Sequence, residues 1–245
     1  MSTPNKQDGF LGILMLDTQF PRILGDAGNI DSFSYPAHTK IVTGAGSLQI
    51  VKDGKPSTIL IEQFCQATKS LEDDGAKAII STCGFLITIQ DIISDAVNIP
   101  VMVSGLSLYP KIKQEYDLSK IGILTASSKN LGSTALRAAG IASSDVVIDG
   151  FEDCDPFTSV ILQDKSKQPD HIDAQAIERA AVQKAQNMLA DHPDIGAILL
   201  ECGNLPPYAE AIKQATSLPL FSIIDGANLL MHDHGSLKTL MGARV

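Results

Sequence analysis

The sequence has little positive charge. Its 245 residues carry 19 lysines and arginines against 28 aspartates and glutamates, which gives a formal net charge of −9. Phosphate binding requires clustered lysines and arginines, so this balance argues against a nucleic-acid-binding surface. Arginine is especially scarce, and the four are Arg22, Arg137, Arg179 and Arg244. We expect no nucleic-acid partner.

The sequence also lacks any apolar run of the roughly 18–20 residues that a bilayer-spanning helix needs. Its first ten residues, MSTPNKQDGF, have no basic region followed by an apolar stretch, so they do not resemble a secretory leader. Hydrophobic residues make up 44% and charged residues 19%, as in ordinary globular enzymes. These features predict a cytoplasmic protein with no membrane partner.

Cysteine is sparse, and metal and nucleotide motifs are missing. Four cysteines without close spacing argue against a disulfide framework and against a zinc site. His232 and His234 stand two residues apart, so on a helix they face different directions and do not chelate together. The short run GAG at 44–46 lacks the continuation of a phosphate-binding motif and is typical of a turn. We expect no metal and no other cofactor.

Apolar runs bounded by glycine, proline and polar residues alternate with amphipathic stretches along the chain. This alternation is typical of βα units and a parallel sheet. The expected strands are 11–16, 38–42, 78–82, 100–103, 121–125, 146–148, 195–201 and 220–223. The expected helices are 57–74, 85–97, 128–139, 172–191, 206–216 and 227–240.

The most informative feature that is present is an internal repeat. Cys83-Gly84 in KAIISTCGF recurs as Cys202-Gly203 in GAILLECGN, 119 residues further on and without a gap. In both halves a buried strand precedes the pair, and a helix and a turn ending in proline follow it. The strand LGILMLD of the first half likewise recurs as IGILTAS in the second. The repeat predicts two similar lobes.

The repeat also suggests where the lobes divide. We expect the first lobe to comprise residues 1–104 together with 219–245, because the final segment is predicted to form a helix that packs back on it. The second lobe then comprises residues 105–218. Two long loops, 18–37 and 151–170, interrupt the regular pattern. Loops of this length in a compact α/β protein are usually functional lids or mobile segments.

Each cysteine of the repeat directly follows a buried strand, where ligands bind in open α/β sheets. It also opens the next helix, whose dipole and free N–H groups lower the pKa of a thiol below its free value of about 8.5. Two thiols facing one cleft suit the inversion of a carbon centre, since one removes a proton and the other delivers one to the opposite face. Two such contacts to one carbon place the sulfurs roughly 6–9 Å apart, too far for a disulfide. Cys65 and Cys154 lie outside the repeat and are interpreted as small buried hydrophobic residues.

In these features the chain resembles the aspartate/glutamate/hydantoin racemase superfamily, whose members use paired cysteines and no cofactor. The resemblance covers nearly the whole chain, through ISTCGF, LLECGN, the GIL strand starts and the VNIP and SLPL segments. It implies an α/β fold of two flavodoxin-like lobes with parallel sheets, related by a pseudo-twofold axis, with the active site in the interlobe cleft. It further implies a racemase or epimerase of amino acids or hydantoin-like compounds that acts at a carbon alpha to a carboxylate or carbonyl. The expected partner is therefore a small-molecule carboxylate substrate. A homodimer is an additional expectation.

The resemblance assigns Cys83 and Cys202 as the paired catalytic acid and base. The candidate substrate-binding residues around them are Asp17, Arg22, Gly84, Phe85, Thr125, Ser127, Gly203 and Asn204. An arginine can clamp a carboxylate with two parallel hydrogen bonds, but for Arg22 we favour the interpretation as a solvated loop residue. Asp17 can orient the first cysteine or cap a turn, and Glu201 can act in the site or end a strand.

The triplets CGF at 83–85 and CGN at 202–204 depart from the Cys-Asn-Thr and Cys-Thr-His or Cys-Thr-Glu that amino-acid racemases of this group commonly carry. The missing polar side chains predict weak activity toward aspartate and glutamate, and Phe85 favours a less polar substituent. Two alternatives stay open. One is a cis–trans isomerase of the maleate isomerase type, in which one thiolate adds to an alkene diacid. The other is a two-lobed binding protein with vestigial cysteines. The two retained cysteines disfavour an arylmalonate decarboxylase, which resembles a one-cysteine variant.

Overall fold

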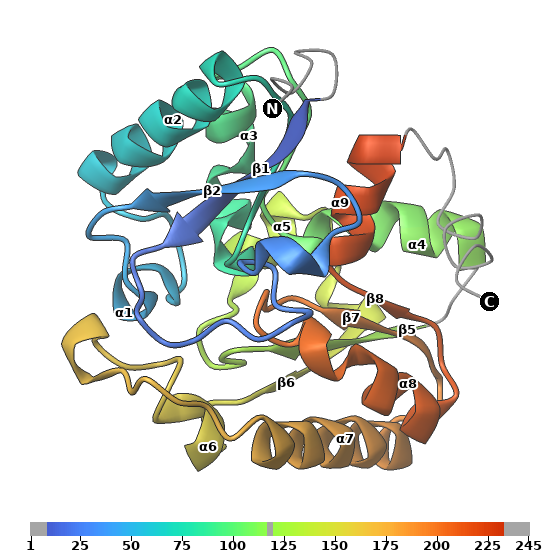
Figure 1. The fold of residues 1–245 in the computed structure, drawn as a ribbon. Coiled ribbons are helices and arrows are strands. Elements are labelled where there is room, and N and C mark those ends of the chain that lie inside the picture. Colours follow the sequence, from blue (N-terminus) through green and yellow to red (C-terminus); the bar gives the residue numbers. More distant parts are fainter. Residues whose placement is uncertain (1–8, 117–119, 233–245) are drawn as a thin grey trace.

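The computed structural model describes residues 9–116 and 120–232 and contains two parallel β-sheets of four strands each (Figure 1). The sheets have the strand orders β2-β1-β3-β4 and β6-β5-β7-β8. The first consists of β1 (Phe10–Leu16), β2 (Ala37–Val42), β3 (Ala76–Ser81) and β4 (Val101–Met102). The second consists of β5 (Lys120–Thr125), β6 (Val146–Gly150), β7 (Ile195–Leu200) and β8 (Leu220–Phe221). The predicted α/β fold with two similar parallel-sheet lobes is confirmed.

The two sheets share one internal register, which explains the sequence repeat. β1 pairs with β3 so that Leu11 lies opposite Ala78, and β5 pairs with β7 so that Ile121 lies opposite Ala197. In both pairs the register shifts after the first residue of the strand, between Phe10 and Leu11 and between Lys120 and Ile121. These residues occupy equivalent positions of the repeat, so the duplicated sequence forms duplicated strand pairs. Each cysteine of the repeat therefore stands beyond the carboxyl end of the equivalent strand, β3 or β7.

Alternate residues of β1 enter different hydrophobic clusters. Leu14 belongs to the cluster that includes α2 (Thr58–Asp73), whereas Leu11 belongs to the cluster that α9 (Ile223–His232) completes. Because successive side chains of a strand point to opposite faces, both faces of the first sheet need a cover. The last described helix of the chain supplies one of these covers (Figure 1).

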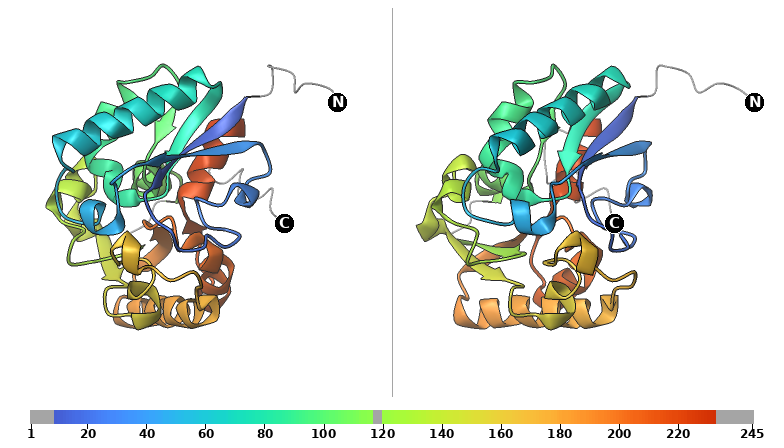
Figure 2. Two further views of the ribbon diagram at one scale, coloured as in Figure 1. Left: turned by 60° about the vertical axis from the view of Figure 1, so that its left-hand side comes forward. Right: turned by 90° about the vertical axis from the view of Figure 1, so that its left-hand side faces the viewer.

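In the second lobe, α7 (Ala174–Asp191) and α8 (Ala209–Thr216) pack side by side beneath the sheet in the view of Figure 1, and they stay on that side in Figure 2. Asp173 begins α7, because its side chain accepts a hydrogen bond from the Ala176 N–H at 2.9 Å. The shorter helices are α1 (Ser47–Ile50), α3 (Gln90–Ser94), α4 (Tyr109–Tyr116), α5 (Ser133–Ala138) and α6 (Asp155–Thr158). The 3₁₀ turns are η1 (Ile30–Ser32), η2 (Gly84–Ile89), η3 (Gly105–Leu108), η4 (Ser143–Asp145), η5 (Lys165–Lys167) and η6 (Pro206–Tyr208).

The predicted helix over 85–97 is wrong in its first half, which forms the 3₁₀ turn η2 before the short helix α3. All six residues of η2 are buried, so this segment has no polar face with the period of an amphipathic helix. Gln90 then attaches α3 to the chain after it. Its amide donates to the Val101 carbonyl at 2.9 Å and accepts the Val103 N–H at 2.8 Å. The segment after the second cysteine also begins as a 3₁₀ turn, η6.

The expected lobe boundary at residue 219 needs a small correction. β8 pairs with β7 and therefore belongs to the second sheet, although that boundary assigns it to the first lobe. The chain then returns to the first lobe, where α9 packs against β3 and β4. The predicted helix over 227–240 begins four residues earlier, and its end, with His234, lies outside the described residues. The remaining division into 1–104 and 105–218 stays a prediction.

The two Cys-Gly turns touch where the lobes meet. A Cβ atom at Gly203 would lie 2.5 Å from the carbonyl oxygen of Thr82, the residue before the first cysteine. A Cβ atom at Gly84 would overlap the carbonyl oxygen of Glu201, the residue before the second cysteine. Each glycine therefore packs against the backbone that leads to the other cysteine. The contact is reciprocal, as a pseudo-twofold relation between the lobes requires.

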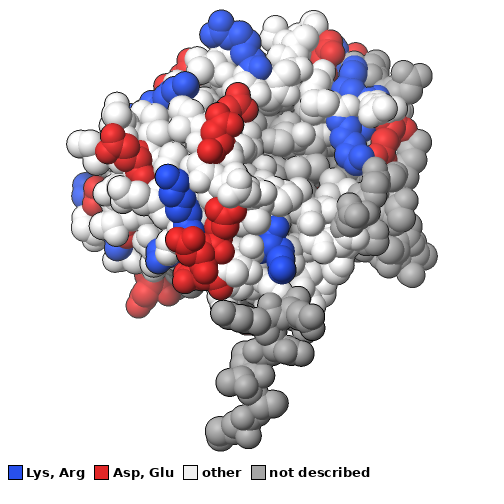
Figure 3. Space-filling model, turned by 90° about the horizontal axis from the view of Figure 1, so that it is seen from above, with Lys and Arg blue, Asp and Glu red and all other residues white. Residues whose placement is uncertain are grey.

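Acidic and basic side chains are interspersed on the face of the molecule seen in Figure 3. Exposed and half-buried ion pairs include Lys120 with Asp194 at 3.0 Å and Lys184 with Asp153 at 2.8 Å. Among the residues that the structure describes, no helix has both the length and the apolar character needed to cross a membrane.

Gly203→Ala should lower the free energy of unfolding by about 1–3 kcal/mol, because the added methyl group meets the carbonyl of Thr82 and the lobes must shift. Gly9→Ala is the matched control. Its Cβ would meet only the flexible side chain of Lys77, so its effect should stay within about 0.5 kcal/mol. Urea denaturation of both variants measures the difference, and equal effects would contradict the proposed role of the backbone contact.

Candidate active site

Both cysteines of the repeat line one cavity between the lobes. Cys83 follows β3 and begins η2, and Cys202 follows β7. Their side chains are buried, and they line one narrow cavity. Its walls come from both halves of the chain, and the lining residues are Leu16, Thr18, Phe20, Arg22, Ser47, Val51, Thr82, Cys83, Gly84, Phe85, Ala126, Ile161, Glu201, Cys202 and Asn204.

Each of the two sulfurs accepts a hydrogen bond from the backbone. The N–H of Phe85 donates a hydrogen bond to the sulfur of Cys83, and the N–H of Asn204 donates one to the sulfur of Cys202. In each case the donor stands two residues after the cysteine, in the turn that the glycine allows. Hydrogen bonds of this kind favour the thiolate and lower the pKa of the thiol.

The expectation that both thiols have a lowered pKa is wrong for this structure. Burial raises the pKa of Cys83 and of Cys202 far above the ordinary value, and the charge of Glu201 raises both further. The turns that follow the cysteines supply single N–H donors, and these do not outweigh desolvation. Arg22 opposes the shift at Cys83, whereas Asp26 adds to it at Cys202. Both thiols are therefore held protonated at neutral pH.

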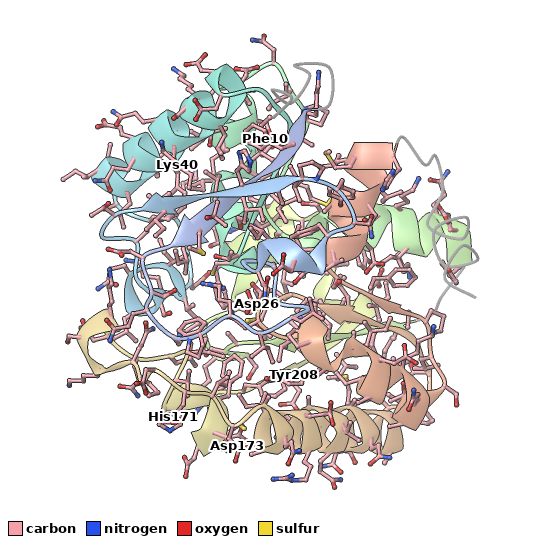
Figure 4. All side chains as sticks on the ribbon, in the orientation of Figure 1. Phe10, Asp26, Lys40, His171, Asp173 and Tyr208 are labelled. Carbon is pink, nitrogen blue, oxygen red and sulfur yellow. The ribbon has the colours of Figure 1, made fainter. Side chains whose placement is uncertain are left out.

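A hydrogen-bond network connects the first-lobe loop to Cys202. The Arg22 guanidinium donates to Asp26 Oδ1 at 2.9 Å and to Thr18 Oγ1 at 3.0 Å. Asp26 Oδ2 accepts the Asn204 amide at 2.7 Å, and the thiol of Cys202 donates to Asn204 Oδ1 at 3.6 Å. Asp26 is buried and lies between the upper and lower halves of the molecule (Figure 4). The network joins the lobes and orients Arg22 at the cavity wall.

Glu201 is a buried carboxyl at the end of β7 and is 1% exposed. Its Oε2 accepts the Thr125 hydroxyl at 2.7 Å, and its carboxylate also accepts the Ala126 N–H. Its Oε1 has no hydrogen-bond partner among the described residues. Burial raises the pKa of Glu201 to about 7, and the two hydrogen bonds oppose this shift. Since Gly84 has no side chain, the carboxyl packs directly against its backbone.

The structure brings six of the ten predicted site residues to the cavity. They are the two cysteines with Arg22, Gly84, Phe85 and Asn204. The other four, Asp17, Thr125, Ser127 and Gly203, are not among its lining residues.

These four residues have other contacts. The carboxylate of Asp17 accepts the Gly44 N–H at 2.9 Å and pairs with Lys165 at 2.5 Å, which lowers its pKa. Thr125 donates its hydroxyl to Glu201, and Ser127 is buried. Of the segment 125–127, only Ala126 is among the described residues that line the cavity.

Sequence reasoning missed part of the site. It left Glu201 open between an active-site role and a strand end, although a charge at the end of an otherwise apolar strand is a recognisable signal. Asp26 carried no local signal, because its partners Arg22 and Asn204 come from a loop and from a distant half of the chain. Among the described residues, no group of three histidine, cysteine, aspartate or glutamate side chains could hold a metal ion.

The loop 151–170, expected to be a lid or mobile segment, reaches across to the first lobe. Its Gln168 accepts two hydrogen bonds of 2.9 Å from Gln19, one from the backbone N–H and one from the side-chain amide. The pair of Lys165 with Asp17 lies beside them, and Ile161 of the same loop lines the cavity. The loop therefore closes one side of the site.

Comparisons with known proteins point to the same architecture. A family model described as Asp/Glu/Hydantoin racemase matches residues 38–232. A dimethylsulfoniopropionate lyase of Durusdinium sp. clade D is 32% identical over 235 residues, which is 93% of this chain and 76% of that protein. Dimethylsulfoniopropionate lyase 7 of Emiliania huxleyi (strain CCMP1516) is 30% identical over 228 residues. The match takes in 89% of this chain but only 65% of that longer protein. Unliganded arylmalonate decarboxylase superposes with a TM-score of 0.56 at 12% identity, over 91% of this chain and 93% of that one.

Cys83 and Cys202 should react with iodoacetamide at least about tenfold more slowly at pH 7.5 than they do in the urea-unfolded chain, because both are buried and protonated. Cys83 should be the faster of the two, since Arg22 favours its thiolate and Asp26 disfavours that of Cys202. Mass spectrometry of the labelled peptides measures both rates. Labelling of either folded-state thiol at the unfolded rate would disprove the raised pKa.

Glu201→Gln should remove one component of the pH dependence of stability. The folded protein holds the Glu201 proton up to about pH 7, whereas an ordinary glutamate loses it near 4.5. Between these values the folded state binds more protons, so wild-type stability falls as pH rises. Relative to the variant, the wild type should lose about 3 kcal/mol of unfolding free energy between pH 4.5 and 8. Urea titrations across this range test it, and a pH-independent difference would refute the assignment.

Proposed function

This chain belongs to the Asp/Glu/hydantoin racemase family, and from that premise we propose that it is a lyase that cleaves dimethylsulfoniopropionate. The observation that carries the proposal is identity over nearly the full chain, at 32% and 30%, to two proteins named as dimethylsulfoniopropionate lyases. The structural match to arylmalonate decarboxylase, at 12% identity, supports the fold alone.

The proposed reaction begins as a racemisation does, with removal of a proton from the carbon next to a carboxylate. A thiolate of the cavity takes this proton, and the C–H electron pair forms a double bond to the next carbon. The bond from that carbon to the sulfonium sulfur breaks, and its electrons leave with the sulfur. The products are acrylate and neutral dimethyl sulfide, and the thiol later returns its proton to water. Elimination therefore needs one base, whereas racemisation needs an acid and a base.

The cavity offers suitable groups for such a substrate. Arg22 is the one cation among the described residues that line it, and its guanidinium can receive the substrate carboxylate. Phe20 and Phe85 line the cavity as well and provide apolar contacts for two methyl groups.

A cofactor-independent racemase or epimerase is the second candidate, and the observation that favours it is the placement of both thiols in one cavity. Weak activity toward aspartate and glutamate is still expected, because Gly84 and Phe85 stand at the wall where polar side chains would be needed. The homodimer, the cytoplasmic location and the separation between the sulfurs stay predictions.

Purified protein should release dimethyl sulfide and acrylate from dimethylsulfoniopropionate, as measured by headspace gas chromatography and NMR. Cys83→Ser and Cys202→Ser are compared with Cys65→Ser, whose residue lies outside the cavity. The variant that removes the catalytic base, Cys83→Ser or Cys202→Ser, should lower kcat by on the order of 100-fold or more. The control variant Cys65→Ser should keep full activity.

The same three variants separate the two candidate functions. A racemase would give no dimethyl sulfide, would incorporate solvent deuterium next to the carboxylate of a chiral acid, and would lose racemisation in both active-site variants. Absence of dimethyl sulfide from the wild type, with such exchange present, would replace the lyase by the racemase.

A further inference from the structure

The charges in the cavity are unevenly compensated. Arg22 has a partner, because Asp26 accepts its hydrogen bond at 2.9 Å and both side chains are almost fully buried. Glu201 lines the same cavity, and its Oε1 is buried without a hydrogen-bond partner among the described residues. A buried carboxylate that lacks a counter-charge is unfavourable, and its pKa rises until it is partly neutralised. The value of about 7 agrees with this, because it leaves the carboxyl close to ionisation at neutral pH.

The structural role of residue 201 is to accept a backbone N–H from the neighbouring strand, and this role does not require a charge. In the first half of the repeat the equivalent residue is Thr82, 119 residues earlier. Its hydroxyl accepts the N–H of Leu16 at 3.2 Å, just as Glu201 accepts the N–H of Ala126. A neutral hydroxyl therefore suffices to connect the two central strands of a lobe. This task does not need the carboxylate of Glu201, and its unpartnered oxygen packs against Gly84, which lines the cavity as Glu201 does.

We propose that Glu201 binds the cationic end of the substrate, with its unpartnered oxygen opposite the onium centre and with Arg22 opposite the substrate carboxylate. The inference rests on the proposed function for the identity of the cation, a sulfonium. It makes Glu201 a specificity-determining residue, because a neutral acid of the same shape leaves the buried carboxylate uncompensated. The recognised class is a small zwitterion that carries a carboxylate and a trialkyl onium group.

Such binding also favours the thiolate form of the cysteines. Burial is the main cause of the raised pKa of Cys83 and Cys202, and the negative charge of Glu201 raises both further. A bound cation next to Glu201 offsets this second contribution, so part of the upward shift is removed when the substrate is in place.

Two unreactive ligands of equal shape and different charge test the proposal. One is 3-(trimethylammonio)propionate, and the other is 4,4-dimethylpentanoate, in which carbon replaces the charged nitrogen. Isothermal titration calorimetry at pH 8 should show that the wild type binds the cationic ligand at least about tenfold more tightly than the neutral one. Glu201→Gln should reduce this ratio to about one, while its affinity for the neutral ligand is maintained or improved.

A pH series adds a readout that a purely structural role would not change. The wild-type preference for the cationic ligand should grow as pH rises through about 7, because the carboxylate form of Glu201 binds the cation. The titratable groups that face Glu201 are Cys83 and Cys202, which stay protonated in this range, and Arg22 keeps its charge. Glu201→Gln should therefore show no such trend between pH 6 and 8.

Asp26→Asn is the matched control, since it neutralises a second buried carboxyl that Arg22 already compensates. It should change the affinity for both ligands by a similar factor, through Arg22, and should keep the preference for the cation. Thermal unfolding of each variant under the same conditions verifies that it is folded. The cysteines are left intact, so binding is measured apart from turnover.

The outcomes separate this proposal from the proposed function. Equal wild-type affinity for the two ligands, binding of neither, or an unchanged preference in Glu201→Gln would overturn the role of Glu201, whether or not dimethyl sulfide is released. A preference for the cation that Glu201→Gln abolishes supports the role even in a protein that releases no dimethyl sulfide, and in that case only the lyase assignment fails.

Discussion

At the centre of the molecule, Gly84 packs against the carbonyl of Glu201, and Gly203 packs against that of Thr82. Backbone packs against backbone there, so no side chain separates the turns that follow β3 and β7. This approach places both buried thiols on the wall of one narrow cavity. It also gives Glu201 its place, because a side chain at Gly84 would occupy the space of that carboxyl.

The pseudo-twofold relation holds for the backbone and fails for the charges. Each sulfur accepts a hydrogen bond from the N–H of the residue two positions later. The side chains of Thr82 and Glu201 likewise accept the N–H groups of the equivalent residues Leu16 and Ala126. Yet Thr82 is neutral where Glu201 is a carboxyl, and Arg22 and Asp26 come from a loop of the first lobe alone. An inversion at one carbon demands similar groups on both sides, whereas an elimination demands one base and an orientation for the leaving group. The unequal charges suit the second demand.

Proton removal next to a carboxylate is the step that the two candidate functions share, and it explains why one scaffold can serve both. The fate of the resulting carbanion depends on the substrate, since a carbanion with an onium group on the next carbon has a leaving group to expel. Recognition of that group then decides the outcome more than the cysteines do. In this structure, Glu201, Phe20 and Phe85 line the cavity in which we propose that this recognition takes place.

The residue pattern was sufficient for the eight described strands, the two-lobe α/β fold and the pair of cysteines at equivalent strand ends. Apolar runs and βα alternation are local signals, and a gapless repeat is found by comparing the sequence with itself. It also identified Arg22, Gly84, Phe85 and Asn204 as neighbours of the cysteines. Tertiary structure alone decided that Asp17 pairs with Lys165, 148 residues away, and that Asp26 bridges Arg22 and Asn204. It also decided that burial and Glu201 raise the pKa of both thiols, against the expectation from their place after a strand. A pKa depends on the solvent and charges that surround a group in space, and the spacing of residues along a chain does not contain that information.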